Sequence, residues 1–266
     1  MNAKFSNMAS FSRMALGISM AITLASGAMT AVFADEAPGD DLSPNQILKR
    51  TEEAYASLVS YSDEGQTVSA SGGNATTFTI RMARTNFYLI EWEKNDESSF
   101  VPRYLLAQAV WSSGAGDYLE EECGVQPQFD REFALAHAAA PSGGAAAMIP
   151  MMFFHMPLQW GITFVDSEPE ENRQADEQVG DVDCFVITGA SQGQTKTLWI
   201  GKGDYLIRQI RTMVNCEALR AAIANWDPEI MPYLHGFTWT ETHTNIVVNK
   251  RFLRTDFIPS ISRRNF

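Results

Sequence analysis

One short motif in this sequence could carry nucleophilic chemistry. Residues 189–193 read G-A-S-Q-G, which matches the G-x-S-x-G turn that presents a catalytic serine, here Ser191. That turn requires a strand before it and a helix after it, and either His235 or His243 would have to act as the base. The segment after the motif, residues 195–200, has the composition of a strand. We therefore expect a hairpin turn here and keep a serine hydrolase using Ser191 as an alternative.

The histidines and acidic residues do not predict a metal site or a catalytic carboxylate pair. His235 and His243 would share a face of one strand but stand about 26 Å apart at ~3.3 Å per residue. Five carboxylates are bunched in one polar loop, whereas a catalytic pair must converge across a cleft: Glu168, Glu170, Glu171, Asp176 and Glu177. The sequence also lacks the glycine-rich phosphate-binding motifs. We expect no metal, no cofactor and no enzymatic activity.

The N-terminus has the three parts of a secretory signal peptide. Lys4 and Arg13 form a sparse positive region, an apolar run covers residues 14–33, and V-F-A precedes Asp35. Small and hydroxyl residues interrupt the run, which favours cleavage over a permanent membrane anchor. We expect cleavage after Ala34, a periplasmic location and no remaining membrane span. Residues 35–42 would then form a flexible lead-in, and residues 43–266 a single domain.

Charge and cysteine content narrow the possible partners. Removing Lys4 and Arg13 with the signal leaves 18 basic and 32 acidic side chains, a net charge of −14. Nucleic acid is therefore not an expected partner, because phosphate binding needs a positive field.

In an oxidising compartment, Cys123, Cys184 and Cys216 predict one disulfide and one thiol, and the sequence leaves all three pairings open.

The elements that must position these residues begin with a capped helix. Ser43 can act as N-cap, Pro44 suits the first helical position, and Gln46 completes a capping box. Apolar residues continue at helical spacing as far as Tyr61, so the spacing predicts an amphipathic helix that ends before Gly65.

Alternating apolar and polar residues then predict a series of strands. The expected strands cover residues 78–82, 88–92, 105–111, 118–119, 184–188, 197–200, 206–214 and 237–248, with a closing segment at 250–258. Helices are expected at residues 129–140 and 217–224. Short strands joined by turns favour an antiparallel sheet over alternating β-α units.

An uncharged Met/Phe-rich segment, residues 148–157, interrupts this pattern. It contains two prolines, so it is not expected to form a straight helix. Methionine adapts its shape to varied apolar ligands. Three roles remain open for the segment: a plug at one end of the core, a mobile lid over an apolar cavity, and a protein-interaction patch.

Four stretches of the sequence resemble one known family. They are AYASLVSYSDEGQ at residues 54–66, residues 78–84 before FYLIE at 87–91, VWSSG at 110–114, and TLWIGKGDYLIRQ at 197–209. In this order they resemble the periplasmic lipoprotein carrier (LolA-like) superfamily, although Gly201 stands where that family usually has Asp.

The resemblance implies a mainly β (α+β) fold: an incomplete, strongly curved antiparallel β-barrel with an N-terminal helix and short helices covering its concave face. In carriers of this family the cavity holds lipoprotein acyl chains, and some relatives are sensors that bind partner proteins. We therefore expect a non-catalytic protein that binds a lipid or an acylated lipoprotein, with an envelope sensor or scaffold as an alternative. Candidate lining residues are Phe78, Ile80, Tyr88, Trp92, Trp111, Met152, Phe153, Phe154, Trp199 and Trp239.

Overall fold

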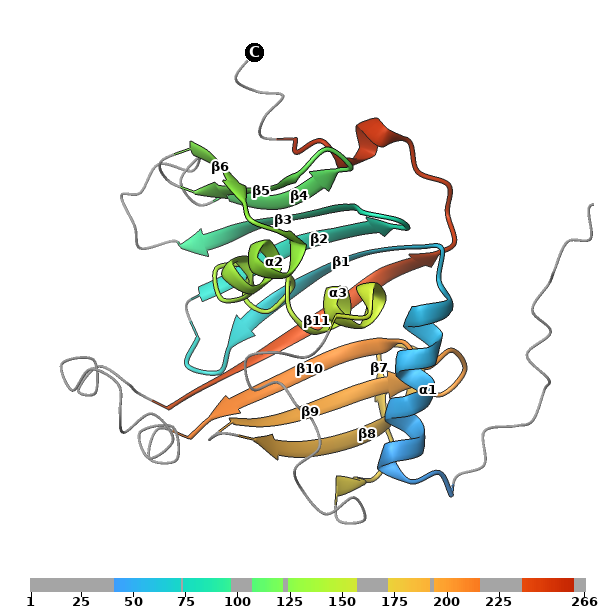
Figure 1. The fold of residues 1–266 in the computed structure, drawn as a ribbon. Helices are drawn as coiled ribbons and strands as arrows, with labels where there is room; N and C mark the ends of the chain where they lie inside the picture. The colour runs from blue at the N-terminus through green and yellow to red at the C-terminus, as the bar shows by residue number, and fades with distance from the viewer. Residues whose placement is uncertain are drawn as a thin grey trace, which may run out of the picture. The chain divides into compact units, whose positions relative to one another are not determined.

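One antiparallel sheet organises the part of the chain that the computed structural model describes (Figure 1). The structure describes residues 41–72, 74–96, 107–121, 124–156, 172–191, 194–215 and 236–260, all within one compact unit, Pro38–Phe266. In these residues the sheet has 11 strands in the order β6-β5-β4-β3-β2-β1-β11-β10-β9-β8-β7. Two meanders, β1 to β6 and β7 to β11, are joined by the pairing of β1 with β11. The edge strands β6 and β7 do not pair with each other, so the sheet stays open.

The elements have the following bounds. The strands are β1 (Ser60–Ser69), β2 (Asn74–Ala83), β3 (Phe87–Asp96), β4 (Ala107–Ser113), β5 (Asp117–Glu121), β6 (Gly124–Gln128), β7 (Glu177–Val179), β8 (Val182–Ser191), β9 (Gln194–Gly201), β10 (Ile207–Val214) and β11 (Phe237–Val248). The helices are α1 (Pro44–Ser57), α2 (Arg131–Ala139), α3 (Met148–Phe154) and the 3-10 helix η4 (Arg254–Phe257).

Helix α1 begins where the capping signals predict. The Ser43 side chain accepts a hydrogen bond from the Gln46 backbone, and the Gln46 side chain accepts one from the Ser43 backbone. Its Tyr55 hydroxyl accepts a hydrogen bond from the Ile207 backbone N–H at 3.1 Å, which ties the helix to β10. The helix ends at Ser57, so Tyr61 belongs to β1 and not to the helix, contrary to the spacing argument.

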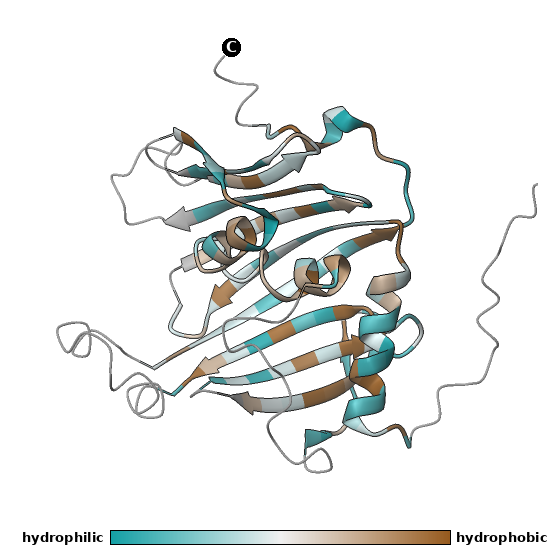
Figure 2. Cartoon of the chain, viewed as in Figure 1, coloured by the Kyte–Doolittle hydropathy of each residue, from teal (hydrophilic) through white to brown (hydrophobic). Residues whose placement is uncertain are grey.

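The two faces of the sheet are covered differently. Helices α1, α2 and α3 lie over one face (Figure 1), which we call the concave face, and the main apolar cluster lies between them and the strands. Brown and teal segments alternate along the strands (Figure 2), as expected for a sheet with one buried face. Helix η4 packs on the opposite face, where Phe257 contacts Leu89, Ala109 and Trp111.

Most predicted strands are confirmed, and three strands were missed: β1, β6 and the three-residue edge strand β7. Strand β1 carries Asp63, Gly65 and Thr67 at the inward positions where alternation requires apolar side chains, and β6 is exposed along most of its length. Residues 148–154 form a helix despite Pro150, because a proline in the first turn removes an N–H that has no partner inside the helix. The closing segment forms η4 instead of a strand. The predicted helix at 217–224 lies outside the described residues.

No helix among the described residues combines the length and the apolar character that crossing a bilayer requires. The predicted signal peptide lies outside the described residues.

Gly65 provides a test of how tightly β1 fits between its neighbours. A Cβ at this position would lie 2.3 Å from both the Phe78 ring and the Thr242 carbonyl oxygen. We expect Gly65→Ala to lower the free energy of unfolding by about 1–3 kcal/mol or more through overpacking, as measured by urea denaturation. Gly203→Ala is the control, because a Cβ there meets no atom within 4 Å. Equal urea midpoints for the two variants would contradict this packing.

Candidate functional site

The candidate site is the concave face, where apolar side chains line both halves of the sheet. In the first half they are Phe78, Ile80 and Met82 of β2 and Tyr88, Ile90 and Trp92 of β3. In the second half they are Phe185 and Ile187 of β8, Leu198 and Ile200 of β9, and Ile207 and Ile210 of β10. The paired strands β1 and β11 separate the halves, and their inward-facing side chains include buried polar groups. The apolar surface therefore has two parts. We call the part on β2 and β3 the first lane and the part on β8, β9 and β10 the second lane; the polar strip of β1 and β11 lies between them.

The structure brings seven of the ten predicted lining residues into one cluster. Four come from the strands and three from α3: Phe78, Ile80, Tyr88, Trp92, Met152, Phe153 and Phe154. Trp111 packs instead against Leu89 on the opposite face, and Trp199 packs against Cys184 and Val186 in a third cluster. Trp239 is half-buried on β11 and stacks on Phe237, with ring centroids 5.0 Å apart. Alternation shows which residues share a face of a strand, but it does not show which face the helices cover.

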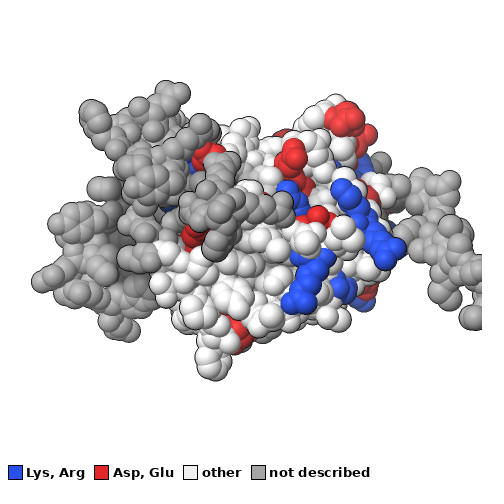
Figure 3. All heavy atoms as spheres, turned by 90° about the horizontal axis from the view of Figure 1, so that it is seen from above, with Lys and Arg blue, Asp and Glu red and all other residues white. Residues whose placement is uncertain are grey.

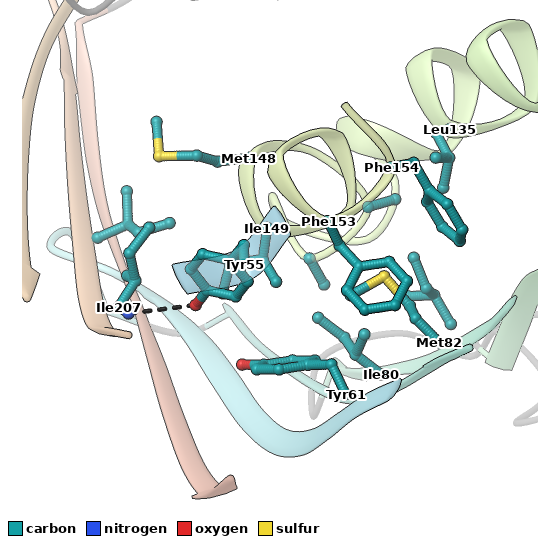
Figure 4. Close-up of a cluster of buried hydrophobic side chains, with 14 of the residues drawn as sticks. Tyr55, Tyr61, Ile80, Met82, Leu135, Met148, Ile149, Phe153, Phe154 and Ile207 are labelled. Carbon is teal, nitrogen blue, oxygen red and sulfur yellow. Dashed lines mark hydrogen bonds between the residues drawn. The ribbon is translucent and has the colours of Figure 1, made fainter. Parts of the chain in front are cut away.

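Helix α3 is the apolar element that covers the first lane. None of its seven residues is charged, and all except Met152 are buried. Figure 4 shows Phe153 lying over Ile80 and Met82 of β2. The Phe154 ring meets the Tyr88 ring edge-on at 5.9 Å.

Two arginines hold α3 from the side. The guanidinium carbon of Arg84 lies 4.2 Å from the centre of the Phe153 ring, and that of Arg131 lies 4.1 Å from the centre of the Phe154 ring. Arg84 also donates hydrogen bonds to the carbonyls of Tyr55, Ala56 and Leu58 at the end of α1. It therefore links α1 to α3, by cation–π contact on one side and hydrogen bonds on the other.

A buried ion cluster occupies the polar strip. His243 Nδ1 lies 2.7 Å from Asp63 Oδ2, and its Nε2 lies 3.0 Å from Glu241 Oε1. The second contact is an ion pair without hydrogen-bond geometry. The Tyr61 hydroxyl donates to the same Asp63 oxygen at 2.6 Å. The side chains of the three ionisable residues are at most 4% exposed.

The two carboxylates keep the imidazole of His243 charged. Burial opposes the charged form, but the adjacent Asp63 and Glu241 outweigh it and raise the pKa of His243 to about 10. Glu241 also attracts Lys196 of β9, whose pKa is lowered by burial despite that attraction. Sequence reasoning missed this cluster, although Glu241 and His243 stand two residues apart and so share one face of a strand.

The connector between α2 and α3, residues 140–147, contacts this polar strip. The Thr67 hydroxyl donates to the Gly143 carbonyl at 2.9 Å. Gly143 and Gly144 have φ of 69° and 110°, a region that favours glycine. A Cβ on Gly144 would lie 2.3 Å from Glu241 Oε2, so only glycine allows this approach. The strip thereby sets the position of the helices that cover the lanes.

Gly189, Ala190 and Ser191 of the G-x-S-x-G motif form the end of β8, and β9 begins at Gln194, whereas Gln192 and Gly193 lie outside the described residues. A strand leaves the motif where a nucleophile turn would need a helix. Both ring nitrogens of His243 face carboxylates, so this histidine has no free nitrogen to serve Ser191. His235 lies outside the described residues.

The described residues contain no group of three or more His, Cys, Asp or Glu side chains that could hold a metal ion. Asp176 of the acidic segment forms ion pairs with Arg173 and Lys202.

Cys184 is a buried free thiol whose pKa is raised by burial to about 11. Cys123 and Cys216, the remaining candidates for a disulfide, lie outside the description.

Comparisons with known proteins give weak structural likenesses. No protein-family model matches the chain, and no curated protein matches it either. A DUF1329 family protein from Desulfovibrio piger is similar with a TM-score of 0.36 and 11% identity, over 82% of this chain and 99% of that one. PNGF-II in two space groups gives TM-scores of 0.29 and 0.28, at 5% and 6% identity, and 30% of its length is covered. Likenesses at this level assign neither a family nor a function.

The ion cluster predicts a loss of stability at alkaline pH. The pKa of His243 is raised from 6.5 to about 10 in the folded protein, so its stabilisation is complete below about pH 6.5 and is lost as pH rises through 10. We expect His243→Gln to destabilise the protein by about 3–5 kcal/mol near pH 6 and to remove most of this pH dependence. Urea denaturation at several pH values measures both effects.

His137→Gln is the matched control, because His137 is exposed and lies outside the cluster. It should leave both the stability and its alkaline decline unchanged. A wild-type protein whose stability stays constant between about pH 7 and pH 10 would show that His243 is not held in its charged form.

Proposed function

We propose that this chain is an exported, non-catalytic protein that binds an acyl chain, from a lipid or a lipoprotein, in the lane of β2 and β3 that α3 now covers. The observation that carries the proposal is an uncharged, Met/Phe-rich helix packed on an apolar surface. Such a helix can exchange its contacts for those of a flexible apolar ligand, because neither state leaves a charge unpaired in the core.

The free energies of the two states are comparable. Burying each large apolar side chain of α3 contributes about 1.5–3 kcal/mol, so its five large buried residues, Met148, Ile149, Met151, Phe153 and Phe154, contribute roughly 8–15 kcal/mol. An acyl chain of about 16 carbons contributes roughly 13 kcal/mol at about 0.8 kcal/mol per methylene. Replacing the helix by the ligand is therefore close to balanced, as a reversible carrier requires.

The polar contacts of α3 are few, which would allow an acyl chain to displace the helix from the strands. Its N-terminus has no side-chain cap, and the described residues give it no ion pair. Besides apolar packing, only the cation–π contacts of Arg84 and Arg131 hold it in the described part of the chain, and a partly desolvated contact of this kind contributes about 1–2 kcal/mol. Arg84 keeps its three carbonyl partners when Phe153 leaves, so α1 stays anchored.

A charge introduced on α3 tests the binding proposal. Met152 is half-buried and packs against the main cluster. When α3 gives up its strand contacts, its connector to α2 still holds it over the bound chain, so Met152→Lys places an ammonium group beside the ligand. We expect this variant to bind a fluorescent long-chain acyl probe about tenfold more weakly, because desolvating the new charge opposes insertion of the chain. Probe titration measures the affinity, and native mass spectrometry of the purified protein identifies any acyl species already bound.

Met213→Lys is the matched control. Met213 is also a partly exposed methionine, but it lies on β10 between Thr212 and Val214, which are buried on the covered face, and so it points to the other side of the sheet. It should bind the probe as the wild type does. Absence of probe binding in the wild type, together with no extractable lipid, would rule out the proposed function.

Export is tested separately from ligand binding. We propose that residues 1–34 act as a signal peptide and that the mature chain begins at Asp35 in the periplasm. Intact-mass analysis of protein purified from a periplasmic fraction should show a chain that has lost Met1 to Ala34. A full-length chain retained in the cytoplasm or the inner membrane would contradict this assignment.

A further inference from the structure

The surface formed by the end of β11, the segment before η4 and the adjacent Val59 combines basic and apolar side chains. We call it the β11–η4 surface, and it comprises Val59, Val248, Lys250, Arg251, Leu253 and Arg254, all of which are exposed. Val59 is 65% exposed and Leu253 64%, so both present apolar surface next to the basic side chains. Figure 3 shows Lys and Arg side chains grouped on one side of the molecule seen from above, with some acidic side chains among them.

The surface is held in place by buried neighbours. Phe257 is buried against the sheet and its ring meets that of Phe252 at 5.6 Å. The Asp256 side chain accepts a hydrogen bond from the Leu253 backbone N–H at 2.8 Å. Leu253 is therefore presented to solvent on a fixed backbone, with Arg251 and Arg254 on either side in the sequence.

The upstream side of the surface is tied down in the same way. The Asn249 side chain accepts a hydrogen bond from the Val59 backbone N–H at 2.9 Å, and the Ser60 hydroxyl donates to the Lys250 carbonyl at 2.6 Å. These contacts place Val59 beside the basic segment, although the two are about 190 residues apart in sequence.

The charge of this segment is opposite to that of the rest of the chain. Residues 250–266 contain five basic residues and one acidic residue: Lys250, Arg251, Arg254, Arg263, Arg264 and Asp256. The whole chain carries −12, so residues 1–249 carry −16 and the final 17 residues carry +4. This surface attracts a negatively charged partner, whereas the rest of the molecule repels it. The protein should therefore approach such a partner with the β11–η4 surface first.

We propose that the β11–η4 surface docks the protein on a lipid bilayer that contains anionic headgroups. The basic side chains meet the phosphates while Leu253 and Val59 enter the interfacial region, as in other peripheral surfaces that combine cations with apolar side chains. An acidic protein would need an apolar pocket for Leu253 placed between its carboxylates, whereas a bilayer offers anionic headgroups above an apolar interior at every point of its surface. The bilayer therefore satisfies both the cations and Leu253.

The interaction is weak and sensitive to salt. Each basic residue near an anionic surface contributes about fivefold in affinity, and screening reduces that contribution beyond about 8–10 Å at physiological ionic strength. Lys250, Arg251, Arg254 and Leu253 therefore give reversible docking, not permanent anchorage.

Vesicle flotation of the full mature chain tests the proposal. We expect binding to vesicles of phosphatidylglycerol with phosphatidylcholine, weaker binding at high salt, and none to phosphatidylcholine alone. The double variant Arg251→Glu with Arg254→Glu should lose at least about 25-fold in apparent affinity. Leu253→Ser should lose a few-fold while keeping the salt dependence.

The double variant Lys49→Glu with Lys94→Glu is the control. It changes the net charge by the same amount at exposed positions on α1 and β3 and should bind vesicles nearly as the wild type does. Equal losses in both double variants would overturn the proposal, because net charge alone would explain binding. Absence of vesicle binding by the wild type, including the case in which it binds a soluble polyglutamate peptide instead, would also overturn it.

Discussion

The contact of His243 with Asp63 and Glu241 is the interaction on which the arrangement of this chain depends. It lies where β1 meets β11, the single strand pair that joins the two meanders, and it links residues 180 positions apart. Three buried charges are costly unless they are paired with one another. Any slip in the register of β1 on β11 would separate them, so the cluster opposes alternative pairings more strongly than apolar side chains would.

The helices take their positions from the same strip. Gly144 can approach Glu241 only because it has no Cβ, and Gly143 accepts a hydrogen bond from Thr67 of β1. Polar contacts thus locate the connector between α2 and α3, while α3 itself is held mainly by apolar packing and two cation–π contacts. A cover built in this way can lose its apolar contacts to a ligand while its connector stays in place.

Sequence patterns predicted the elements whose signals are local. The capping box of Ser43 and Gln46 placed the start of α1, and alternation placed β2, β3 and β11. Strand β1 was missed because its inward positions carry Asp63, Gly65 and Thr67, which follow no apolar rhythm. The ion cluster was missed because its partners meet only through long-range strand pairing, and Trp111 was assigned to the site because alternation does not identify the covered face.

Helix α3, which covers the proposed ligand lane, and helix η4, which anchors the proposed docking surface, pack on opposite faces of β3. Helix η4 packs against β3 and β4 through Phe257 and Leu89, whereas the neighbouring Tyr88 and Ile90 face α3. The substitutions that test the two proposals lie on separate segments, Met152 on α3 and residues 251–254 at and before η4. The two activities can therefore be removed independently. A variant that docks without binding an acyl chain, and one that binds without docking, would show that carriage and membrane contact are distinct properties of a single sheet.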